Sequence, residues 1–401
     1  MSAPDVTIAG RPIAGGGPVE VRLSGGRIGA LRPLPDADGA ALPWLGPGLT
    51  DLQVNGYAGE DCNAPDPTVE GVARLTRALW REGVTSYLPT VITNSDAAIA
   101  ASVDAIARAR ATDPLLGATI AGIHLEGPFI SPEDGPRGAH DPAWIGPPDW
   151  ARFARWQAAA RGGIRLVTLA PDWPGAPAFI ARCVASGVAV AIGHTAATPT
   201  QIDAAVAAGA RLSTHLGNGA HPLLPRHPNY LWTQLARDEL SASLIGDGWH
   251  LPDDVLRVVI RVKGAGALLV SDTVALAGQP PGVYATPVGG DVTLTPTGRL
   301  HLTGDPRLLA GSVCPLHGAV AGLVRRGVAP LDAAWAMAST GPARFLGQAT
   351  AAGLAVGAPA DLVACDWDGS TLGIRRTYKA GQLVYDHANA GATHVAAGQH
   401  N

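Results

Sequence analysis

The sequence predicts an α/β fold, a (β/α)8 TIM-like barrel with a small β-sandwich domain that both chain ends form together. Two observations predict this fold. Between residues 49 and 350, short apolar strands alternate with alanine-rich helical segments, and eight strand–helix units can be counted. Outside this range, both ends of the chain consist of short β-rich pieces separated by turns. Strand–helix alternation indicates parallel strands with right-handed crossovers, and eight units favour a closed barrel over an open sheet.

The chain ends supply the small domain. The N-terminal segment carries "DVTIAG" and "PVEVRLSGGRIGAL", followed by the proline-rich "RPLPDADGAALPW". The C-terminal segment carries "DLVACDW" and "LGIRRTYKAGQLVYD", with glycine and aspartate at the turns. Neither end alone has enough strands for a stable sheet. We therefore expect residues 1–48 and 351–401 to form one β-domain beside a barrel of residues 49–350.

The barrel strands are predicted where short apolar runs occur, and the helices where alanine-rich segments follow them. The strands are expected at residues 49–55, 84–92, 118–126, 164–170, 188–194, 211–215, 241–246 and 267–272. The sixth and seventh have the weakest signal, because neither is a long apolar run. The clearest helical segments are "TVEGVARLTRALWREG", "DAAIAASVDAIARARA", "PTQIDAAVAAG" and "PDDVLRVVIRVKG".

Composition excludes several classes of function. A formal net charge of −4 and a pI near 6.3 argue against a protein that binds nucleic acid or an anionic membrane. No uninterrupted apolar run reaches the roughly 18 residues that span a bilayer, and the N-terminus does not resemble a secretory signal. The four cysteines lie far apart without a C-x-x-C pair. We expect reduced thiols and a cytoplasmic protein.

Polar residues stand at the predicted strand ends, where barrels of this type carry their chemistry. Strand three ends at Glu126, strand five at His194, strand six at His215 and strand eight at Asp272. One carboxylate and two imidazoles that converge on the barrel axis would leave an open fourth position, which is the pattern of a catalytic zinc. Asp272 would act as general base for a water molecule. We interpret His124 as a structural residue that points away from the barrel mouth.

Eight motifs, in their order along the chain, resemble those of N-acetylglucosamine-6-phosphate deacetylases of the amidohydrolase superfamily. The resemblance covers nearly the whole chain, and "HLEGPF" and "GAHDP" are its most distinctive elements. The motifs are "PGLTDLQVNGYAG", "HLEGPFISPEDGPRGAHDP", "LVTLAPD", "IGHTAAT", "THLGNGAHP", "DGWHLP", "VSDTVALAG" and "LAGS". The resemblance implies the barrel fold, a small-molecule amino-sugar substrate and a homodimer.

The first motif also bears on the number of metal ions. Superfamily members with two metals carry His-X-His on strand one, and many add a carbamylated lysine at strand four. Here Gln53 and Asn55 replace the histidines, and the only lysines, Lys263 and Lys379, lie outside every predicted strand end. Amides are poor zinc ligands compared with imidazole, so we regard this pair as the remnant of a second site. The resemblance then implies one divalent ion per chain, expected to be zinc, on Glu126, His194 and His215.

The remaining site residues follow from the resemblance alone. His140 of "GAH" matches the histidine that polarises the acetamide carbonyl, and Ser312 ends the "LAGS" segment that would line the acetyl pocket. The sugar phosphate would lie against Asn218, Gly219, Arg226 and His250. This chain departs from the family pattern in "LGNGAHPLLPRHPNYLW", where Asn-Ala-Met is usual, and in Asp-Thr for Asp-Ala on strand eight.

Other functions stay open at this stage. The acetamide could belong to another amino sugar without phosphate, or the protein could be a cyclic amidase related to dihydroorotase. The missing lysine and His-X-His argue against the cyclic amidase. A deaminase normally uses a histidine pair on strand one, which is absent here. A non-catalytic sugar-phosphate-binding relative would not need the complete set of Glu126, His194, His215 and Asp272.

Overall fold

The computed structural model describes residues 5–286 and 290–390. By their internal contacts the described residues form two compact units, one within residues 52–75 and 88–314 and one within residues 1–51, 76–87 and 315–401. Among the described residues, no helix is long and apolar enough to cross a bilayer. The domain boundaries at residues 48/49 and 350/351 remain a proposal.

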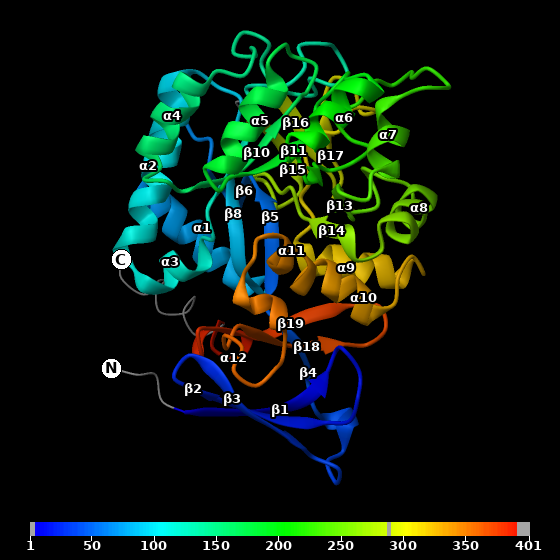
Figure 1. The fold of residues 1–401 in the computed structure, drawn as a ribbon. Coiled ribbons are helices and arrows are strands. Elements are labelled where there is room, and N and C mark those ends of the chain that lie inside the picture. Colours follow the sequence, from blue (N-terminus) through cyan, green and yellow to red (C-terminus); the bar gives the residue numbers. More distant parts are fainter. Residues whose placement is uncertain (1–4, 287–289, 391–401) are drawn as a thin grey trace. The chain divides into compact units, whose positions relative to one another are not determined.

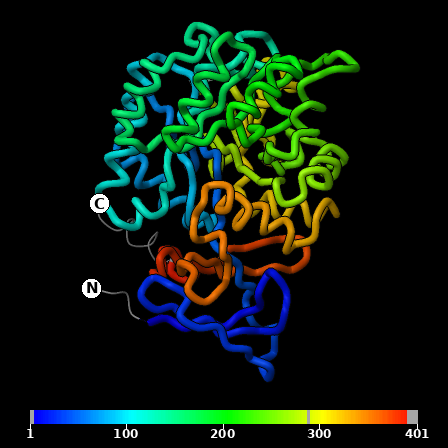
Figure 2. The backbone as a smooth tube through the Cα atoms, in the orientation of Figure 1, coloured from blue at the N-terminus to red at the C-terminus, as the bar shows by residue number. Residues whose placement is uncertain are grey.

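Eight parallel strands form the predicted barrel (Figure 1). They are β5 (Leu49–Val54), β8 (Val84–Ile92), β9 (Ile123–Glu126), β10 (Ile164–Leu169), β11 (Ala189–Ile192), β12 (Leu212–Ser213), β13 (Ser241–Ile245) and β14 (Ala267–Val270). The sheet order runs from β14 down to β8 and then β5. Beyond β14, Thr273 forms a parallel bridge to Val54, and the Asp272 amide donates to the Gln53 carbonyl at 3.0 Å, so the first and last strands meet. Figure 2 follows the chain through these strands in sequence order.

The barrel strands are buried because side chains cover both of their faces. Every residue of β5 is buried, which is typical of parallel strands inside an α/β protein. The helices that follow the strands are α1 (Val69–Arg81), α2 (Asp96–Thr112), α3 (Pro114–Thr119), α4 (Trp150–Ala159), α5 (Ala176–Ala185), α6 (Pro199–Ala207), α7 (Tyr230–Ala236) and α8 (Asp253–Lys263). Local chemistry fixes their starts: Ser95 caps α2, and Thr198 with Gln201 forms a capping box at α6.

The third barrel strand begins later in the structure than the sequence predicts. Residues 118–126 were expected to be extended, but residues 114–119 form α3 and the strand starts at Ile123. The helix forms because Asp113 accepts hydrogen bonds from the amides of Leu115 and Leu116, and Pro114 stands at the first helical position.

Two small sheets adjoin the barrel strands. The ribbon β15 (Gly282–Thr286), β16 (Gly290–Leu294) and β17 (Leu300–Leu302) follows strand β14, and β6 (Gly56–Tyr57) pairs with β7 (Glu60–Asp61) after β5. The ribbon has its own apolar core of Val292, Leu294 and Leu300. These insertions follow the carboxyl ends of barrel strands, which is the end where barrel proteins carry their sites.

Both chain ends contribute to a seven-stranded sheet, as predicted. Its order is β20-β19-β18-β4-β1-β2-β3. The strands are β1 (Val6–Pro12), β2 (Val19–Ser24), β3 (Arg27–Pro33), β4 (Trp44–Pro47), β18 (Leu362–Trp367), β19 (Leu372–Lys379) and β20 (Gln382–Asp386). The first half of β1 pairs with β2 and its end pairs with β4, so β1 joins two layers. Their shared core includes Val21 and Leu23 from one layer and Leu45 and Leu362 from the other, which is the packing of a sandwich.

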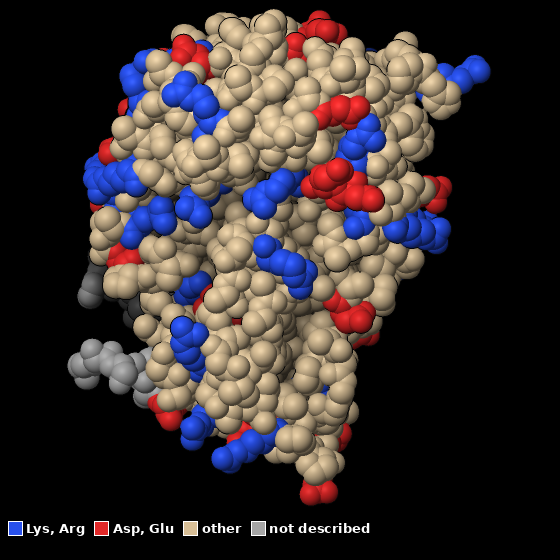
Figure 3. Space-filling view, in the orientation of Figure 1, with Lys and Arg blue, Asp and Glu red and all other residues tan. Residues whose placement is uncertain are grey.

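The remaining helices of this unit are α9 (Leu316–Arg325), α10 (Leu331–Met337), α11 (Thr340–Phe345) and α12 (His387–Ala390), and short 3-10 turns occupy Gly39–Ala41, Gly264–Gly266 and Ala349–Ala352 of the chain. On the face drawn in Figure 3, basic and acidic side chains are interspersed and do not gather by sign. This face accordingly offers no extended basic surface of the kind that binds nucleic acid.

Candidate active site

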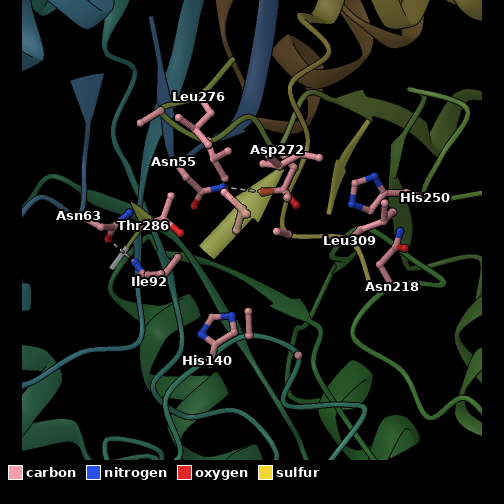
Figure 4. A pocket seen from close by; sticks show the side chains of 18 of the residues that line it. Asn55, Asn63, Ile92, His140, Asn218, His250, Asp272, Leu276, Thr286 and Leu309 are labelled. Carbon is pink, nitrogen blue, oxygen red and sulfur yellow. Dashed lines mark hydrogen bonds between the residues drawn. The ribbon is translucent and has the colours of Figure 1, made fainter. Parts of the chain in front are cut away.

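A cavity of about 740 Å³ lies at the carboxyl ends of the barrel strands. This volume falls within the range of roughly 300–1,000 Å³ that is usual for small-molecule sites. Its polar wall joins residues from strand ends and the loops after them: Asn55, Glu126, His140, His194, His215, Asn218, His250 and Asp272. Figure 4 labels Asn55, His140, Asn218, His250 and Asp272 among them. The ribbon after β14 and the segment that follows it supply much of the apolar wall, including Val292, Leu300 and Leu309.

Glu126, His194 and His215 converge on one point. The Glu126 Oε1 atom lies 3.0 Å from His215 Nε2 and 3.4 Å from His194 Nε2, and the two Nε2 atoms are 3.1 Å apart. A tetrahedral ion with ligands at about 2.0–2.1 Å would separate these atoms by roughly 3.3 Å. The three side chains are nearly fully buried. The donor set of one carboxylate and two imidazoles therefore fits a divalent metal ion of the zinc type.

His194 is held in the tautomer that a metal ion requires. Its Nδ1 atom lies 2.8 Å from the carbonyl oxygen of Pro136, which can only accept, so Nδ1 carries the proton and Nε2 presents a lone pair. Two glycines make room for the ring: a Cβ atom at Gly138 would lie 3.3 Å from it and one at Gly219 only 2.7 Å. Phe129 anchors the loop that carries Pro136, packing against Trp156 and other aromatic residues.

The strand-end residues share an unusual backbone conformation. His194, His215 and Asp272 have φ angles of 51°, 27° and 49°, in the left-handed region that side chains other than glycine avoid. Such strain costs about 1–3 kcal/mol at each position and persists only where neighbours impose it. Here hydrogen bonds impose it: Ser131 donates to the His194 carbonyl, and the His215 amide donates to Ser243 Oγ.

Electrostatics in the cluster keep Glu126 ionised. Burial alone would raise the pKa of this carboxyl, but the neighbouring His194 and His215 side chains hold it well below its usual value. Burial opposes the charged form of His215, yet the hydrogen bond and charge of Glu126 raise its pKa above the usual value. Glu126 and His215 thus stabilise each other's charged forms.

Asp272 has the opposite character. Burial and the nearby Glu126 charge raise its pKa to about 6, while His215, His250 and a hydrogen bond from Asn55 limit the increase. Asn55 Nδ2 donates to Asp272 Oδ1 at 2.7 Å, the contact drawn as a dashed line in Figure 4. A carboxylate with a pKa near the working pH suits a general base.

Gln53 and Asn55 therefore have partners that the sequence did not reveal. Gln53 is buried, and its Nε2 atom donates to Glu126 Oε1 at 2.8 Å. Together the two amides hold Glu126 and Asp272, the two carboxylates of the site. In this structure they act as hydrogen-bond donors to the site.

Two further histidines are oriented by neighbours. His250 lies with its Nδ1 atom 2.7 Å from Asp247 Oδ2, which leaves Nε2 as its free nitrogen. His140 lies with Nδ1 2.7 Å from the Thr93 hydroxyl, and burial together with His194 lowers its pKa to about 3. His140 also stands close to the metal-type cluster, because ligand atoms of Glu126, His140 and His194 lie within 4.8 Å of one another. His124, by contrast, is buried and bonded to Leu52 and Thr168, as a structural residue is.

Not every predicted residue lines the cavity. Asn218 and Gly219 do, and Leu309 to Gly311 do, but Ser312 is buried behind them and accepts a hydrogen bond from the Cys314 amide. Arg226 is exposed on the loop before α7, outside the cavity lining. Arg307, which the sequence did not suggest, lies on the cavity rim and pairs with Asp305.

Sequence reasoning also missed three supporting residues. Thr93 follows the second barrel strand and Asp172 follows the fourth. Asp172 accepts hydrogen bonds from the Thr195 hydroxyl and the Ala196 amide, which fixes the turn after His194. The search for polar residues at strand ends, which found Glu126, would also have found Thr93 and Asp172. Asp247 stands inside the quoted "DGWH" motif, three residues before His250.

Comparison with known proteins gives a consistent result. The Amidohydrolase family model matches residues 44–384. The chain is 32% identical over 347 residues to the N-acetylglucosamine-6-phosphate deacetylase of Vibrio furnissii, covering 86% of this chain and 84% of the relative. It is likewise 32% identical over 351 residues to the human enzyme of that name, covering 85% and 83%.

Solved structures agree. A mutant of the Mycobacterium smegmatis N-acetyl-D-glucosamine-6-phosphate deacetylase, in complex with N-acetyl-D-glucosamine-6-phosphate, superposes with a TM-score of 0.82 at 29% identity. The match covers 96% of this chain and all of that chain. The corresponding Pasteurella multocida deacetylase also gives 0.82, at 25% identity, with 94% and 99% covered.

Proposed function

This chain belongs to the amidohydrolase family, and from that premise we propose that it hydrolyses the acetamide of N-acetylglucosamine 6-phosphate to glucosamine 6-phosphate and acetate. One observation carries the proposal: a buried carboxylate and two imidazoles converge at 3.0–3.4 Å beside a separate carboxylate whose pKa is about 6. That arrangement offers a metal site and a general base in one cavity, which amide hydrolysis needs.

The family is metal-dependent, and Glu126, His194 and His215 would hold the ion. We propose one divalent ion per chain and expect zinc, because the donor set is one oxygen and two imidazole nitrogens. When bound there, the ion supplies Lewis acidity that lowers the pKa of a water molecule and polarises a carbonyl oxygen. The two amides support a single ion, since Gln53 and Asn55 use their N–H groups on the carboxylates of the site.

The proton transfers fall to Asp272. As a carboxylate, its free oxygen accepts the proton of the attacking water, while Asn55 holds the other oxygen. When the tetrahedral intermediate breaks, the same carboxyl group gives the proton to the departing amine nitrogen. His140 donates a hydrogen bond to the acetamide oxygen, where negative charge develops.

The 6-phosphate would be bound by a different group of residues. Asn218 and Gly219 line the cavity together with His250, which Asp247 holds in place. Arg226 is proposed as a phosphate ligand on the resemblance, and in this chain it stands on the exposed loop. The apolar segment Leu309 to Gly311 would contact the acetyl methyl group, with Ser312 buried behind it.

The alternative of a cyclic amidase finds less support. Lys263 donates to the carbonyls of Gln234 and Arg237, and Lys379 pairs with Asp361, so neither lysine of the chain is at the end of β10. A homodimer and a cytoplasmic location belong to the proposal as well. All four cysteines are free thiols, as expected in a reducing compartment.

An amine-release assay tests the proposal. The substrates are N-acetylglucosamine with and without the 6-phosphate, and a cyclic amide serves as the third. We expect release of amine and acetate in equal amounts, with the highest kcat/KM on the phosphorylated sugar, loss of activity with a chelator and recovery with zinc. Hydrolysis of the cyclic amide alone, or a preference for the free sugar, would refute the assignment.

A further inference from the structure

We propose that the hydroxyl of Thr93 fixes His140 in the tautomer that carries its proton on Nε2, so that His140 presents a hydrogen-bond donor to the cavity. Thr93 is thus a positioning residue, which acts on the reaction through His140. The inference rests on the proposed function for its catalytic consequence, but the tautomer itself is a property of the protein alone.

The two side chains meet in a buried contact. Thr93 follows the last residue of β8, and His140 belongs to the loop after β9. His140 Nδ1 lies 2.7 Å from Thr93 Oγ1, and 5% of Thr93 and 7% of His140 are exposed. The contact uses Nδ1, so Nε2 is the nitrogen left for the cavity that His140 lines.

Counting protons decides which partner donates. In a neutral imidazole one nitrogen is a donor and the other an acceptor. If Nδ1 donated to Oγ1, the proton of the threonine hydroxyl would need another acceptor. Among the described residues, His140 is the one side chain or carbonyl within hydrogen-bond distance of that hydroxyl. The Gly127 backbone approaches Oγ1 closely, since a Cβ atom added at Gly127 would lie only 2.2 Å from it.

The reverse arrangement satisfies both groups. The hydroxyl donates its proton to Nδ1, and Nε2 carries the ring proton toward the cavity. Leaving a buried hydroxyl donor unpaired costs about 1–3 kcal/mol, which would shift the tautomer ratio by roughly 5- to 150-fold. The Nε2–H tautomer is therefore the one that this pocket selects.

This choice separates two roles for His140. With a lone pair on Nε2, the ring could join Glu126 and His194 as a metal ligand, since their ligand atoms lie within 4.8 Å. With a proton on Nε2, it is a donor that can stabilise the acetamide oxygen. The Thr93 contact selects the second role. His140 then makes an edge-type contact with the His194 ring, with 4.5 Å between the two ring centroids, and lies beside the proposed metal ligands.

Three variants test the inference. Thr93→Val replaces the hydroxyl with a methyl group of similar size, Thr93→Ser keeps the hydroxyl, and His140→Ala removes the ring. Because loss of one donor to a developing oxyanion costs about 10²–10³ in kcat, we expect Thr93→Val to lower kcat by about 10- to 100-fold with KM within about twofold. Thr93→Ser should retain turnover within about threefold of wild type, and metal content should be unchanged in both.

The double variant Thr93→Val/His140→Ala gives the decisive kinetic comparison. If Thr93 acts only through His140, the double variant should have the kcat of His140→Ala. A further loss of kcat in that background, or wild-type turnover in Thr93→Val, would overturn the proposal.

A spectroscopic measurement does not depend on the substrate. In ¹⁵N-labelled protein, with and without zinc, the His140 ring should show a proton on Nε2 and a lone pair on Nδ1, and Thr93→Val should lose that preference. A wild-type spectrum with the proton on Nδ1 overturns the inference. If the wild-type enzyme releases no amine from any acetylated sugar while Nε2 is protonated, the proposed function fails and the tautomer assignment stands.

Discussion

Replacing Gln53 with leucine should weaken metal binding without removing any metal ligand. Gln53 Nε2 donates to Glu126 Oε1 at 2.8 Å, and Oε1 is also the atom that faces His194 and His215. The amide therefore orients the carboxylate oxygen that would bind the ion. Leucine has a similar volume and no donor, so the substitution removes this orientation and little else.

The expected magnitude follows from the bond. A hydrogen bond to a buried charge contributes about 1.5–3 kcal/mol, which corresponds to about 10- to 150-fold in an equilibrium constant. Loss of a residue that supports a metal ligand usually lowers affinity by about 10- to 100-fold, in the same range. We expect the dissociation constant for zinc to rise by about 10- to 100-fold in Gln53→Leu.

Competition with a chromophoric chelator measures the affinity. A matched control is Gln234→Leu, which removes another buried glutamine amide, one that donates to the Tyr230 carbonyl within α7. Both variants should lose some thermal stability, but only Gln53→Leu should lose zinc affinity. If Gln53→Leu binds zinc within twofold of wild type, or if both variants lose affinity equally, the amide does not support the ligand.

Four other variants test the remaining assignments. Asp272→Asn should lower kcat by roughly 10²–10⁴ while zinc stays bound, and near-native turnover would move the base elsewhere. Asn55→Leu removes a hydrogen-bond donor that lowers the pKa of Asp272, which is about 6 in the wild type. Because the base acts only when it is unprotonated, the acid limb of the kcat/KM profile should move to higher pH. An acid limb that does not move would contradict the role of Asn55. Arg226→Ala should lower kcat/KM by about 10- to 150-fold for the phosphorylated sugar alone. The same loss in Arg307→Ala, with Arg226→Ala unaffected, would assign the phosphate to the arginine on the cavity rim.

The strand positions could be predicted because a strand that is buried on both faces consists of consecutive apolar residues in the sequence. The runs ending at Ile92, Glu126 and Leu169 correspond to strands that end at or within one residue of the predicted positions. The sixth strand, Leu212–Ser213, is the shortest, in agreement with its weak sequence signal. The start of the third strand was wrong, because the capping chemistry of Asp113 and Pro114 was not weighed against its apolar run.

The pairing of side chains was less predictable than their positions. Gln53 and Asn55 are two residues apart on one strand, so alternation places both on the same face. That rule does not say which carboxylate each amide meets, because the partners Glu126 and Asp272 come from strands far apart in sequence. The exposed position of Arg226 could not be predicted either, because its loop is rich in proline and has few apolar side chains.

The left-handed conformation of His194, His215 and Asp272 explains why polar residues at strand ends are informative in this fold. A residue within a strand must keep extended dihedrals to remain in the ladder, whereas the first residues beyond it are free to turn. At these positions the chain leaves the ladder with φ of 27–51°, and hydrogen bonds to neighbouring segments offset the free-energy cost of that backbone conformation. Asparagine or glycine adopts this conformation at a lower free-energy cost, so a histidine or aspartate in it indicates that the side chain has a function. The same residues therefore carry both the strain and the groups that we propose for metal binding and proton transfer, and the strand-end criterion finds them without knowledge of the strain.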